Sequence, residues 1–190
     1  MFLWYVFPKN KPHFQRQLLN SRVKERLQNG DIILRYGYGY ISDGIIRHLN
    51  EKYAVSHCGI IQIQNNGIFV IHSDSNSDEK TEGTQITGLD KFTNQSHPNS
   101  IIIVRLKKID STAQNKIIDT ALKYVSEHTP FDYFFNGDDD KELFCTELVW
   151  LSYKKALNRN IFSGDNHQTN LLQFKSLYNI RNFDIIYNEQ

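Results

Sequence analysis

The chain has 190 residues and an almost balanced charge, with 22 basic residues, 21 acidic residues and a formal net charge of +1. This balance gives no indication of a nucleic acid or an anionic membrane surface as partner. A hydrophobic content of 39% is typical of a globular protein, and the length suits one domain with a substantial buried core. We therefore expect a single domain over residues 1–190, with an N-terminal arm and helix (1–28), a core (30–157) and a C-terminal extension (158–190).

Two cysteines, Cys58 and Cys145, are too few for a disulfide scaffold and too far apart along the chain for a zinc knuckle. They are therefore either free thiols or a single bridge. The first seven residues are apolar, but Pro8 and Lys9 follow them and no basic segment leads them, so we expect a docking strand or arm rather than a signal peptide. The compartment is left open: without a signal peptide we expect the cytoplasm, and the cell envelope is the alternative if a leader has been removed. No run reaches the roughly 18 apolar residues of a membrane span.

The first half of the chain alternates between helical and strand-like patterns, separated by glycine and asparagine turn signals. Apolar residues at helical spacing predict a first helix that ends at Asn29-Gly30. Two later β-rich runs are joined by Asn65-Asn66-Gly67, a strong turn signal that predicts a hairpin. In chain order we expect a helix over 13–28, a strand over 31–36, a loop over 37–40, a helix over 43–49 capped by Ser42 with Ile45, Ile46 and Leu49 buried, and hairpin strands over 55–64 and 67–74.

The second half begins with a polar segment, 75–88, that we expect to form a loop or lid leading into a short strand at 86–89. An apolar run within 99–110 is the clearest strand of the chain. The aromatic stretch at 130–140 is expected to be a loop because it follows directly on Pro130. The remaining elements are expected to be helices over 111–125 and 142–157 and a last strand over 183–187.

His57 and Cys58 stand side by side at the start of the first hairpin strand. Successive side chains of a strand point to opposite faces, so this pair is not expected to serve one site together. If His57 is a base, its nucleophile is therefore Cys145. The same alternation argues against a bridge between the two cysteines.

Cys145 lies near the start of the helix predicted over 142–157, after acidic and asparagine residues that suit a helix N-terminus. Backbone N–H groups and the positive end of the helix dipole stabilise a thiolate there. The alternative interpretation is a buried structural cysteine, since free cysteine is among the most buried residue types.

His72 lies at the far end of the second hairpin strand, which brings it near His57 across the ladder. A cysteine, a histidine base and a third polar group that orients the base are the parts of a thiol triad. Asp74 is a second candidate for the orienting group. Histidines at strand ends are also common as hydrogen-bonded structural residues, and that alternative stays open for both.

Other motifs indicate less. The run Asp138-Asp139-Asp140 lacks the alternating ligands and the glycine of a calcium loop, and the chain has no HExxH pair. The segment GYGYISDG lacks the spacing of a phosphate-binding loop. We therefore expect no cofactor and no metal, with one open alternative, a soft metal bound by His57, Cys58 and another histidine.

Four segments, GDIILRYGYGYISDGIIRHL, VSHCGII, PFDY and LFCTELVWLSYKKA, together resemble the circularly permuted branch of the NlpC-type papain-like superfamily, close to YiiX-like proteins. The resemblance covers roughly residues 30–157, and its sharpest part is the aromatic-Cys-Thr-Glu-Leu-Val stretch. It implies an α+β papain-like fold, in which an antiparallel sheet or partial barrel carries the histidine and precedes a helix with the nucleophile at its N-terminus.

Carried onto this chain, the resemblance implies Cys145 as nucleophile and His57 as general base. The family's third polar position corresponds to His72, where a glutamate is common among YiiX-like members and a histidine among acyltransferase-like relatives. The implied activity is thiol-dependent hydrolysis of an amide through an acyl-enzyme, acting on a peptide, an amino-acid amide or an acylated small molecule.

Two other functions remain open. A lipid acyltransferase or esterase of the lecithin retinol acyltransferase-like type would use the same Cys145 and His57, and a wide apolar groove would favour it. A non-catalytic module that binds a small ligand would keep Cys145 and His57 too far apart to cooperate. The oligomeric state is open as well.

Overall fold

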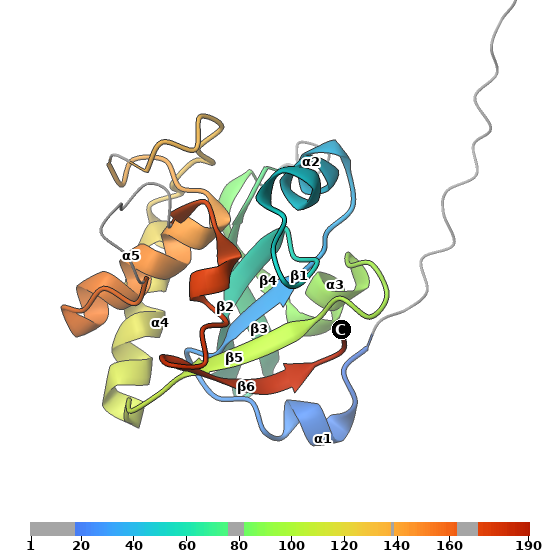
Figure 1. Cartoon of the computed structure of the whole chain (residues 1–190). Coiled ribbons are helices and arrows are strands. Elements are labelled where there is room, and N and C mark those ends of the chain that lie inside the picture. Colours follow the sequence, from blue (N-terminus) through green and yellow to red (C-terminus); the bar gives the residue numbers. More distant parts are fainter. Residues whose placement is uncertain (1–17, 76–81, 138, 163–170) are drawn as a thin grey trace, which may run out of the picture.

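The computed structural model describes residues 18–75, 82–137, 139–162 and 171–190 (Figure 1). Within these residues six strands form one open sheet in the order β4-β3-β2-β1-β5-β6, and every neighbouring pair is antiparallel. The α+β class and the antiparallel sheet predicted from the sequence are confirmed. The strands are β1 (Ile32–Arg35), β2 (His57–Gln64), β3 (Gly67–Asp74), β4 (Gly83–Gly88), β5 (Ile102–Leu106) and β6 (Phe183–Asn188).

The sheet separates two apolar layers. Alternation along β1 divides its side chains between them, since Ile32 and Leu34 join one cluster and Ile33 joins the other. Helices α4 and α5 cover the first face, and α1 and α3 cover the second. The helices are α1 (Ser21–Lys24), α2 (Tyr40–Leu49), α3 (Leu89–Asn94), α4 (Ser111–Ser126) and α5 (Cys145–Leu157), with a 3-10 turn, η1, at Phe174–Ser176.

The start of α5 is held against the sheet by its own approach segment. The hydroxyl of Ser73 donates to the carbonyl of Leu143 at 2.5 Å, and the backbone N–H of Leu143 donates to the carbonyl of Pro130 at 2.9 Å. Farther along α5, the hydroxyl of Tyr153 donates to the carbonyl of Gly30. These bonds place the first turn of α5 beside the ends of β2 and β3. No helix in the described part of the chain has the length and apolar character needed to cross a membrane.

The helix predicted over 13–28 is wrong within the described residues, and its first part, 13–17, lies outside them. Only the single turn α1 is helical, capped by the Asn20 side chain, which accepts from the Val23 N–H at 3.0 Å. Leu19, Val23 and Leu27 are nevertheless buried against the sheet. Their helical spacing therefore correctly indicates which side chains are buried, although a short helical turn and an irregular segment, rather than one long helix, carry them.

The segment predicted as a loop or lid is partly a strand. Residues 76–81 lie outside the described part, but β4 is the full edge strand Gly83–Gly88, longer than the short strand expected at 86–89. The polar composition of this segment is not typical of a strand, which is why β4 was not predicted in full. An edge strand can keep polar side chains at its exposed positions. Thr84 anchors β4 to the end of α4 by donating to the carbonyls of Tyr124 at 2.9 Å and Thr129 at 3.2 Å.

Three helix predictions also need correction. Helix α2 begins at Tyr40 after Gly39, whose φ of 104° favours glycine, so Ser42 is not its cap, and the expected buried face is only half-buried. Helix α5 begins at Cys145 rather than near Glu142, with Phe144 as its N-cap residue. The short helix α3 was not predicted. Neither α2 nor α5 has a side-chain hydrogen bond at its N-cap, so capping signals in the sequence do not locate their starts.

Candidate active site

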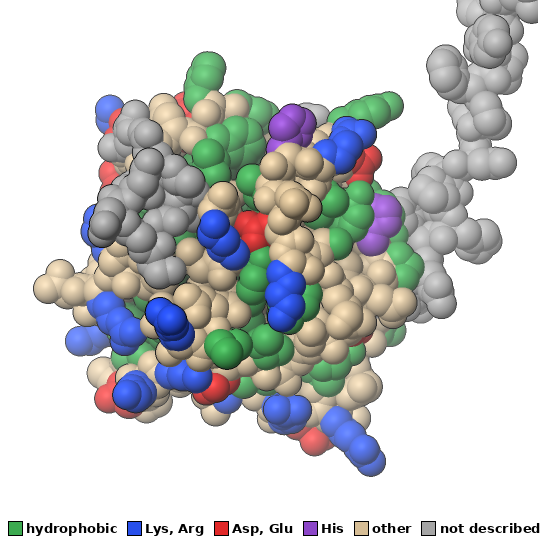
Figure 2. Space-filling model, in the orientation of Figure 1, with side chains coloured by type: hydrophobic (Ala, Val, Ile, Leu, Met, Phe, Trp, Pro, Cys, Tyr) green, Lys and Arg blue, Asp and Glu red, His purple; other side chains and the backbone are tan. Residues whose placement is uncertain are grey.

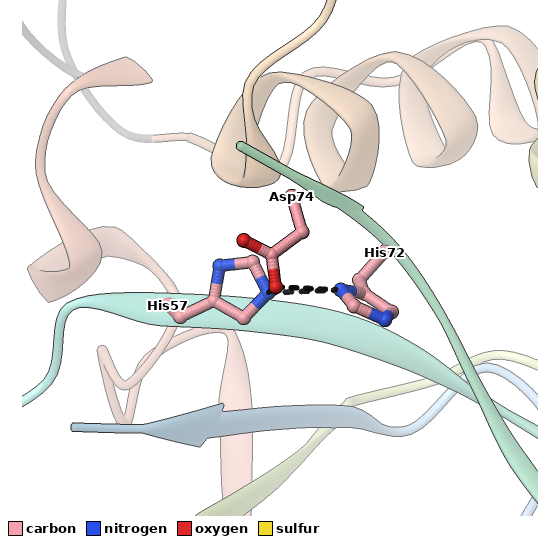
Figure 3. A group of neighbouring side chains, drawn as sticks. All are labelled: His57, His72 and Asp74. Atoms are coloured by element: carbon pink, nitrogen blue, oxygen red, sulfur yellow. Dashed lines mark hydrogen bonds and ion pairs between the residues drawn. The ribbon is translucent and has the colours of Figure 1, made fainter. Parts of the chain in front are cut away.

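His57 and His72 meet across the hairpin, as the sequence predicts (Figure 3). The register pairs Ile60 with Ile71, which makes the two histidines diagonal neighbours on one face of the sheet. Their ring nitrogens, His57 Nε2 and His72 Nδ1, are 3.0 Å apart. The other nitrogen of His72, Nε2, lies 2.9 Å from the Thr87 hydroxyl on β4. The result is a continuous polar chain from β2 through β3 to β4.

His72 is held in its neutral form. Burial lowers its pKa well below the ordinary histidine value, and the charges of His57, Arg35 and Lys91 act in the same direction. Both of its ring nitrogens have partners, so burial leaves neither unsatisfied. A neutral imidazole in this position can orient a second imidazole without adding charge to it.

Asp74, the second candidate for the orienting role, lies over the gap between the two imidazoles (Figure 3). Its Oδ2 atom is 3.9 Å from His57 Nε2 and 3.9 Å from His72 Nδ1, which are ion-pair distances rather than hydrogen bonds. The same oxygen is 3.5 Å from the Arg35 guanidinium. Of the two candidates, His72 is therefore the one that hydrogen-bonds to His57.

Arg35, which the sequence analysis did not single out, faces His57 in the register of β1 and β2. Its guanidinium donates to the carbonyls of Phe92 and Gln95, both at 2.9 Å, and lies 4.3 Å from the centre of the Phe92 ring. Burial lowers its pKa to about 10, and the charges of Asp74 and Cys145 oppose that change. Arg35 therefore keeps its charge at neutral pH. A charged residue that ends an otherwise apolar strand is the sequence signal that could have found it.

Cys145 is the first residue of α5, so its sulfur lies at the helix N-terminus. Its pKa is lowered well below the ordinary thiol value, first by the Cys58 side chain and then, against the opposing effect of burial, by hydrogen bonding with His57 and by the charge of that ring. Cys145 and His57 line the same cavity. The structure thus brings together the two residues, from opposite halves of the chain, that the sequence analysis paired.

Cys58 departs from expectation. Its side chain does belong to the apolar layer under α5, while His57 packs near Phe92 of α3, so the predicted alternation is confirmed. However, Cys58 also interacts with Cys145, and burial together with this interaction raises the pKa of the Cys58 thiol. Both cysteines are free thiols. The expectation that His57 and Cys58 do not serve one site together is therefore wrong, because α5 begins beside the start of β2 and Cys145 interacts with both residues.

The cavity beside these residues has a volume of about 910 Å³. Arg35, His57, Asp74 and Cys145 line it, whereas His72 and Cys58 are not among its lining residues. Aromatic side chains form much of the remaining wall: Tyr38, Tyr40, Phe131 and Phe135. Substrate in this cavity would meet Cys145 and His57 directly and His72 only through His57.

Hydrophobic side chains also project from the surface around α2 and from the segment before α5 (Figure 2). Tyr40 is 94% exposed and Phe134 is 84% exposed. Tyr40 lines the cavity, and Phe134 lies in the chain between Phe131 and Phe135, which also line it. The cavity therefore opens between two apolar edges.

Glu147, in the first turn of α5, is completely buried, and neither of its carboxyl oxygens makes a hydrogen bond of ordinary geometry. Burial raises its pKa to about 8, the backbone N–H of Phe144 partly opposes this rise, and the nearby carboxylates Asp132, Asp139 and Asp140 add to it. Glu147 is therefore mostly a neutral carboxylic acid at neutral pH. It does not line the cavity.

Comparison with known proteins gives consistent results. Residues 26–179 match the family model described as permuted papain-like amidase enzymes of the YaeF/YiiX, C92 type. YiiX of Escherichia coli K12, an uncharacterized protein, is 26% identical over 135 residues, which cover 70% of this chain and 61% of YiiX. The chain thus spans about six tenths of the length of that relative. A crystal structure of YiiX from Escherichia coli O157:H7, described as a metalloprotein, has a TM-score of 0.60 at 23% identity and covers 72% of this chain and 69% of its own.

Proposed function

Because this chain belongs to the YaeF/YiiX (C92) family of permuted papain-like amidases, we propose that it hydrolyses an amide bond with Cys145 as nucleophile and His57 as general base. One observation carries the proposal, the convergence of both side chains on one cavity with a Cys145 pKa held well below that of a free thiol. His72 is a positioning residue in this proposal, since it acts through His57. The expected substrates are a peptide, an amino-acid amide or an acylated small molecule.

The hydrogen-bonded chain leaves His57 with a free ring nitrogen that can accept the thiol proton. With His72 donating from Nε2 to Thr87, its Nδ1 accepts from His57 Nε2–H, and the lone pair of His57 Nδ1 is free. His57 Nδ1 then takes the proton of Cys145, which leaves a thiolate beside an imidazolium. Asp74, 3.9 Å from His57 Nε2, favours that imidazolium.

The chemical steps follow from this ion pair. The Cys145 sulfur attacks the carbonyl carbon of the substrate, and the first-turn N–H groups of α5, which have no partner within the helix, stabilise the oxyanion. The C–N bond breaks as His57 Nδ1 delivers its proton to the leaving amine. Water, deprotonated by the same nitrogen, attacks the thioester and releases the acid, which restores the Cys145 thiol.

Acyl transfer or ester hydrolysis is a second candidate, favoured by the apolar edges of the cavity. The same thiolate attack applies, but an apolar acyl chain would lie between the aromatic walls. A matched series separates the two functions, namely p-nitroanilides of amino acids against p-nitrophenyl esters of increasing acyl-chain length. Amide hydrolysis with little chain-length preference supports the amidase, and an ester rate that rises with chain length supports the alternative. The shared cavity argues against a purely non-catalytic module.

A bound metal is a separate question, because the YiiX protein of the O157:H7 strain is described as a metalloprotein. Within the described residues, His57, His72 and Asp74 are the group whose donor atoms all lie within 4.8 Å of one another and fit a metal ion. Cys58, which the sequence analysis included in a possible soft-metal site, points to the other face, and Asp74 takes its place. A bound ion would supply Lewis-acid polarisation. The hydrolysis proposed above uses only side chains and water.

The test of the proposed function is iodoacetamide labelling of Cys145 against pH, read by peptide mass spectrometry in the presence of a chelator. We expect labelling well below the pH at which a free thiol reacts, and a shift toward ordinary thiol behaviour in His57→Gln. Hydrolysis of the amide series is expected to fall by about 10²–10⁴-fold in His57→Gln and to background in Cys145→Ser. Glu142→Gln, a substitution at an exposed site, is the control. Ordinary thiol labelling in the wild-type protein would contradict the proposal.

A further inference from the structure

We infer that His57, His72 and Asp74 form a reversible, inhibitory site for a divalent ion of the zinc class, in which the ion takes the place of the proton between the two imidazoles. The inference rests on the proposed function in one respect, the role of His57 as base. The ion site itself rests only on the arrangement of the three side chains.

The three donor atoms have the spacing that a small divalent ion requires. His57 Nε2 and His72 Nδ1 are 3.0 Å apart, and each is 3.9 Å from Asp74 Oδ2. Zinc bonds of about 2.0–2.2 Å in a tetrahedral arrangement place neighbouring donors roughly 3.3–3.6 Å apart. The observed triangle brackets that spacing, so movements of about half an ångström would complete it. Two imidazoles and one carboxylate are a donor set that suits zinc, cobalt and similar ions.

The surroundings of the triangle favour binding from the cavity side. The side chains converge from two adjacent strands, with the carboxylate above the gap between the rings (Figure 3). His72 Nε2 is held by Thr87 at 2.9 Å, which is the outer hydrogen bond that fixes a metal-ligating imidazole. His57 and Asp74 both line the cavity, so a fourth ligand position would open into it.

One neighbour limits the affinity. The Arg35 guanidinium lies 3.5 Å from the Asp74 oxygen that would bind the ion. A fixed positive charge at this distance opposes a divalent cation and already pairs with its carboxylate ligand. Binding is therefore expected to be reversible and removable by a chelator, unlike that of a closed structural zinc site.

Ion binding and the proposed base function exclude each other. In the hydrolytic state the proton between His57 Nε2 and His72 Nδ1 leaves the lone pair of His57 Nδ1 free. An ion needs the lone pairs of both facing nitrogens, so a neutral His57 must then carry its proton on Nδ1. That nitrogen can no longer accept the proton of Cys145. The ion would also replace the hydrogen bond between His57 Nε2 and His72 Nδ1 that orients the base.

The binding test uses the full chain, freed of metal, with Co²⁺ as a spectroscopic probe and Zn²⁺ in calorimetric titration. We expect the visible absorption of a low-coordinate Co²⁺ site that Zn²⁺ abolishes. Asp74→Asn and His72→Gln are each expected to weaken Zn²⁺ binding by at least about tenfold, since changes even in outer-shell partners cost that much. Asp184→Asn, at an exposed position away from the site, is the matched control.

Cys145→Ser separates this site from simple capture of zinc by the reactive thiol. Retained Co²⁺ and Zn²⁺ binding in Cys145→Ser supports the inference, and lost binding would place the ion on the sulfur and overturn it. Binding unaffected by Asp74→Asn also overturns it, and because Asp74 is partly exposed, this variant remains informative even if His72→Gln fails to fold.

The activity arm distinguishes failure of the inference from failure of the proposed function. We expect Zn²⁺ to inhibit amide hydrolysis with a midpoint equal to the calorimetric Kd, and a chelator to restore it. Activity without inhibition at saturating Zn²⁺ would overturn the inference and leave the hydrolase intact. A metal-free protein that is inactive and gains activity with Zn²⁺ would overturn both. Zinc binding with no activity under either condition would overturn the proposed function and the inhibitory role, while leaving the ion site in place.

Discussion

The first turn of α5 carries two ionisable side chains with opposite surroundings. Cys145 faces polar partners on β2, and its pKa lies well below the ordinary thiol value. Glu147, two residues later, is fully buried without a hydrogen bond of ordinary geometry to either oxygen, and its pKa is raised to about 8. The helix dipole favours negative charge at both positions. Local partners, rather than position on the helix, therefore decide which group is ionised at neutral pH.

This comparison can be tested first where the effect is largest, at Glu147. The folded-state pKa is raised, so the contribution of this group to stability is complete below its ordinary value of 4.5 and is lost as the pH rises through about 8. Glu147→Gln removes that dependence because the amide does not ionise. We expect the free energy of unfolding of the variant to gain on the wild type by a few kcal/mol between pH 5 and pH 9, since each pKa unit corresponds to about 1.4 kcal/mol.

Urea denaturation at pH 5, 7 and 9 measures this difference. Glu142→Gln, at the exposed approach to the same helix, is the control and is expected to leave the pH dependence unchanged. Parallel curves for Glu147→Gln and the wild type would show that the buried carboxyl is partnered in solution.

The second prediction concerns the polar partners of Cys145 and tests the hydrogen bond between His57 and His72. His72→Leu removes the acceptor for His57 Nε2, and we expect kcat/KM for the amide substrate to fall by about 10–100-fold, the usual cost of losing an orienting partner. His72→Gln offers an amide oxygen in place of Nδ1 and should recover part of the loss. Asp74→Asn, which changes an ion pair at 3.9 Å and no hydrogen bond to His57, should have the smaller effect. A larger loss in Asp74→Asn than in His72→Leu would transfer the orienting role to Asp74.

Cys58 gives a smaller and more specific effect. Its thiol is the first cause of the lowered Cys145 pKa, so Cys58→Ala should move Cys145 back toward ordinary thiol behaviour. We expect the rate of iodoacetamide labelling of Cys145 at pH 6 to fall by about tenfold, consistent with roughly 1.5 kcal/mol for a hydrogen bond to a charged group. Cys58→Ser keeps a donor and should retain most of the rate. Equal rates in the wild type and Cys58→Ala would leave His57 and the helix as the only sources of activation.

Thr87 should show the smallest change. Thr87→Val has nearly the same shape but removes the hydroxyl that holds His72 Nε2. We expect a reduction of about threefold to tenfold in kcat/KM, with Thr87→Ser close to the wild type, because the hydroxyl acts on the sulfur only through His72 and His57. The measurement is steady-state kinetics on the amide series. No difference between valine and serine at this position would limit the polar chain to His57 and His72.

Local sequence patterns determine much of this protein. The Asn65-Asn66-Gly67 turn and its two β-rich flanks are enough to place His57 near His72, because hairpin register follows from turn length. The acidic approach to an amphipathic run correctly indicates that Cys145 lies at a helix start. These are short-range signals, in which backbone conformation and side-chain alternation depend on neighbours along the chain. They suffice for the strand and helix that carry the sulfur and the first imidazole.

Only the tertiary structure decides the rest, because those features depend on residues far apart in sequence. The segment that contains Thr87 forms strand β4 because it pairs with the free edge of β3. Helix α1 is short, although the apolar residues around it are spaced as in a longer helix. Cys58 interacts with Cys145 because α5 begins beside the start of β2, which alternation along one strand cannot reveal. Arg35, Asp74 and the histidines likewise acquire their mutual distances from strand pairing. The sequence alone thus gives the chemical type of each side chain. The lowered pKa of Cys145 and the close approach of the His57, His72 and Asp74 donor atoms arise only from packing between separate elements.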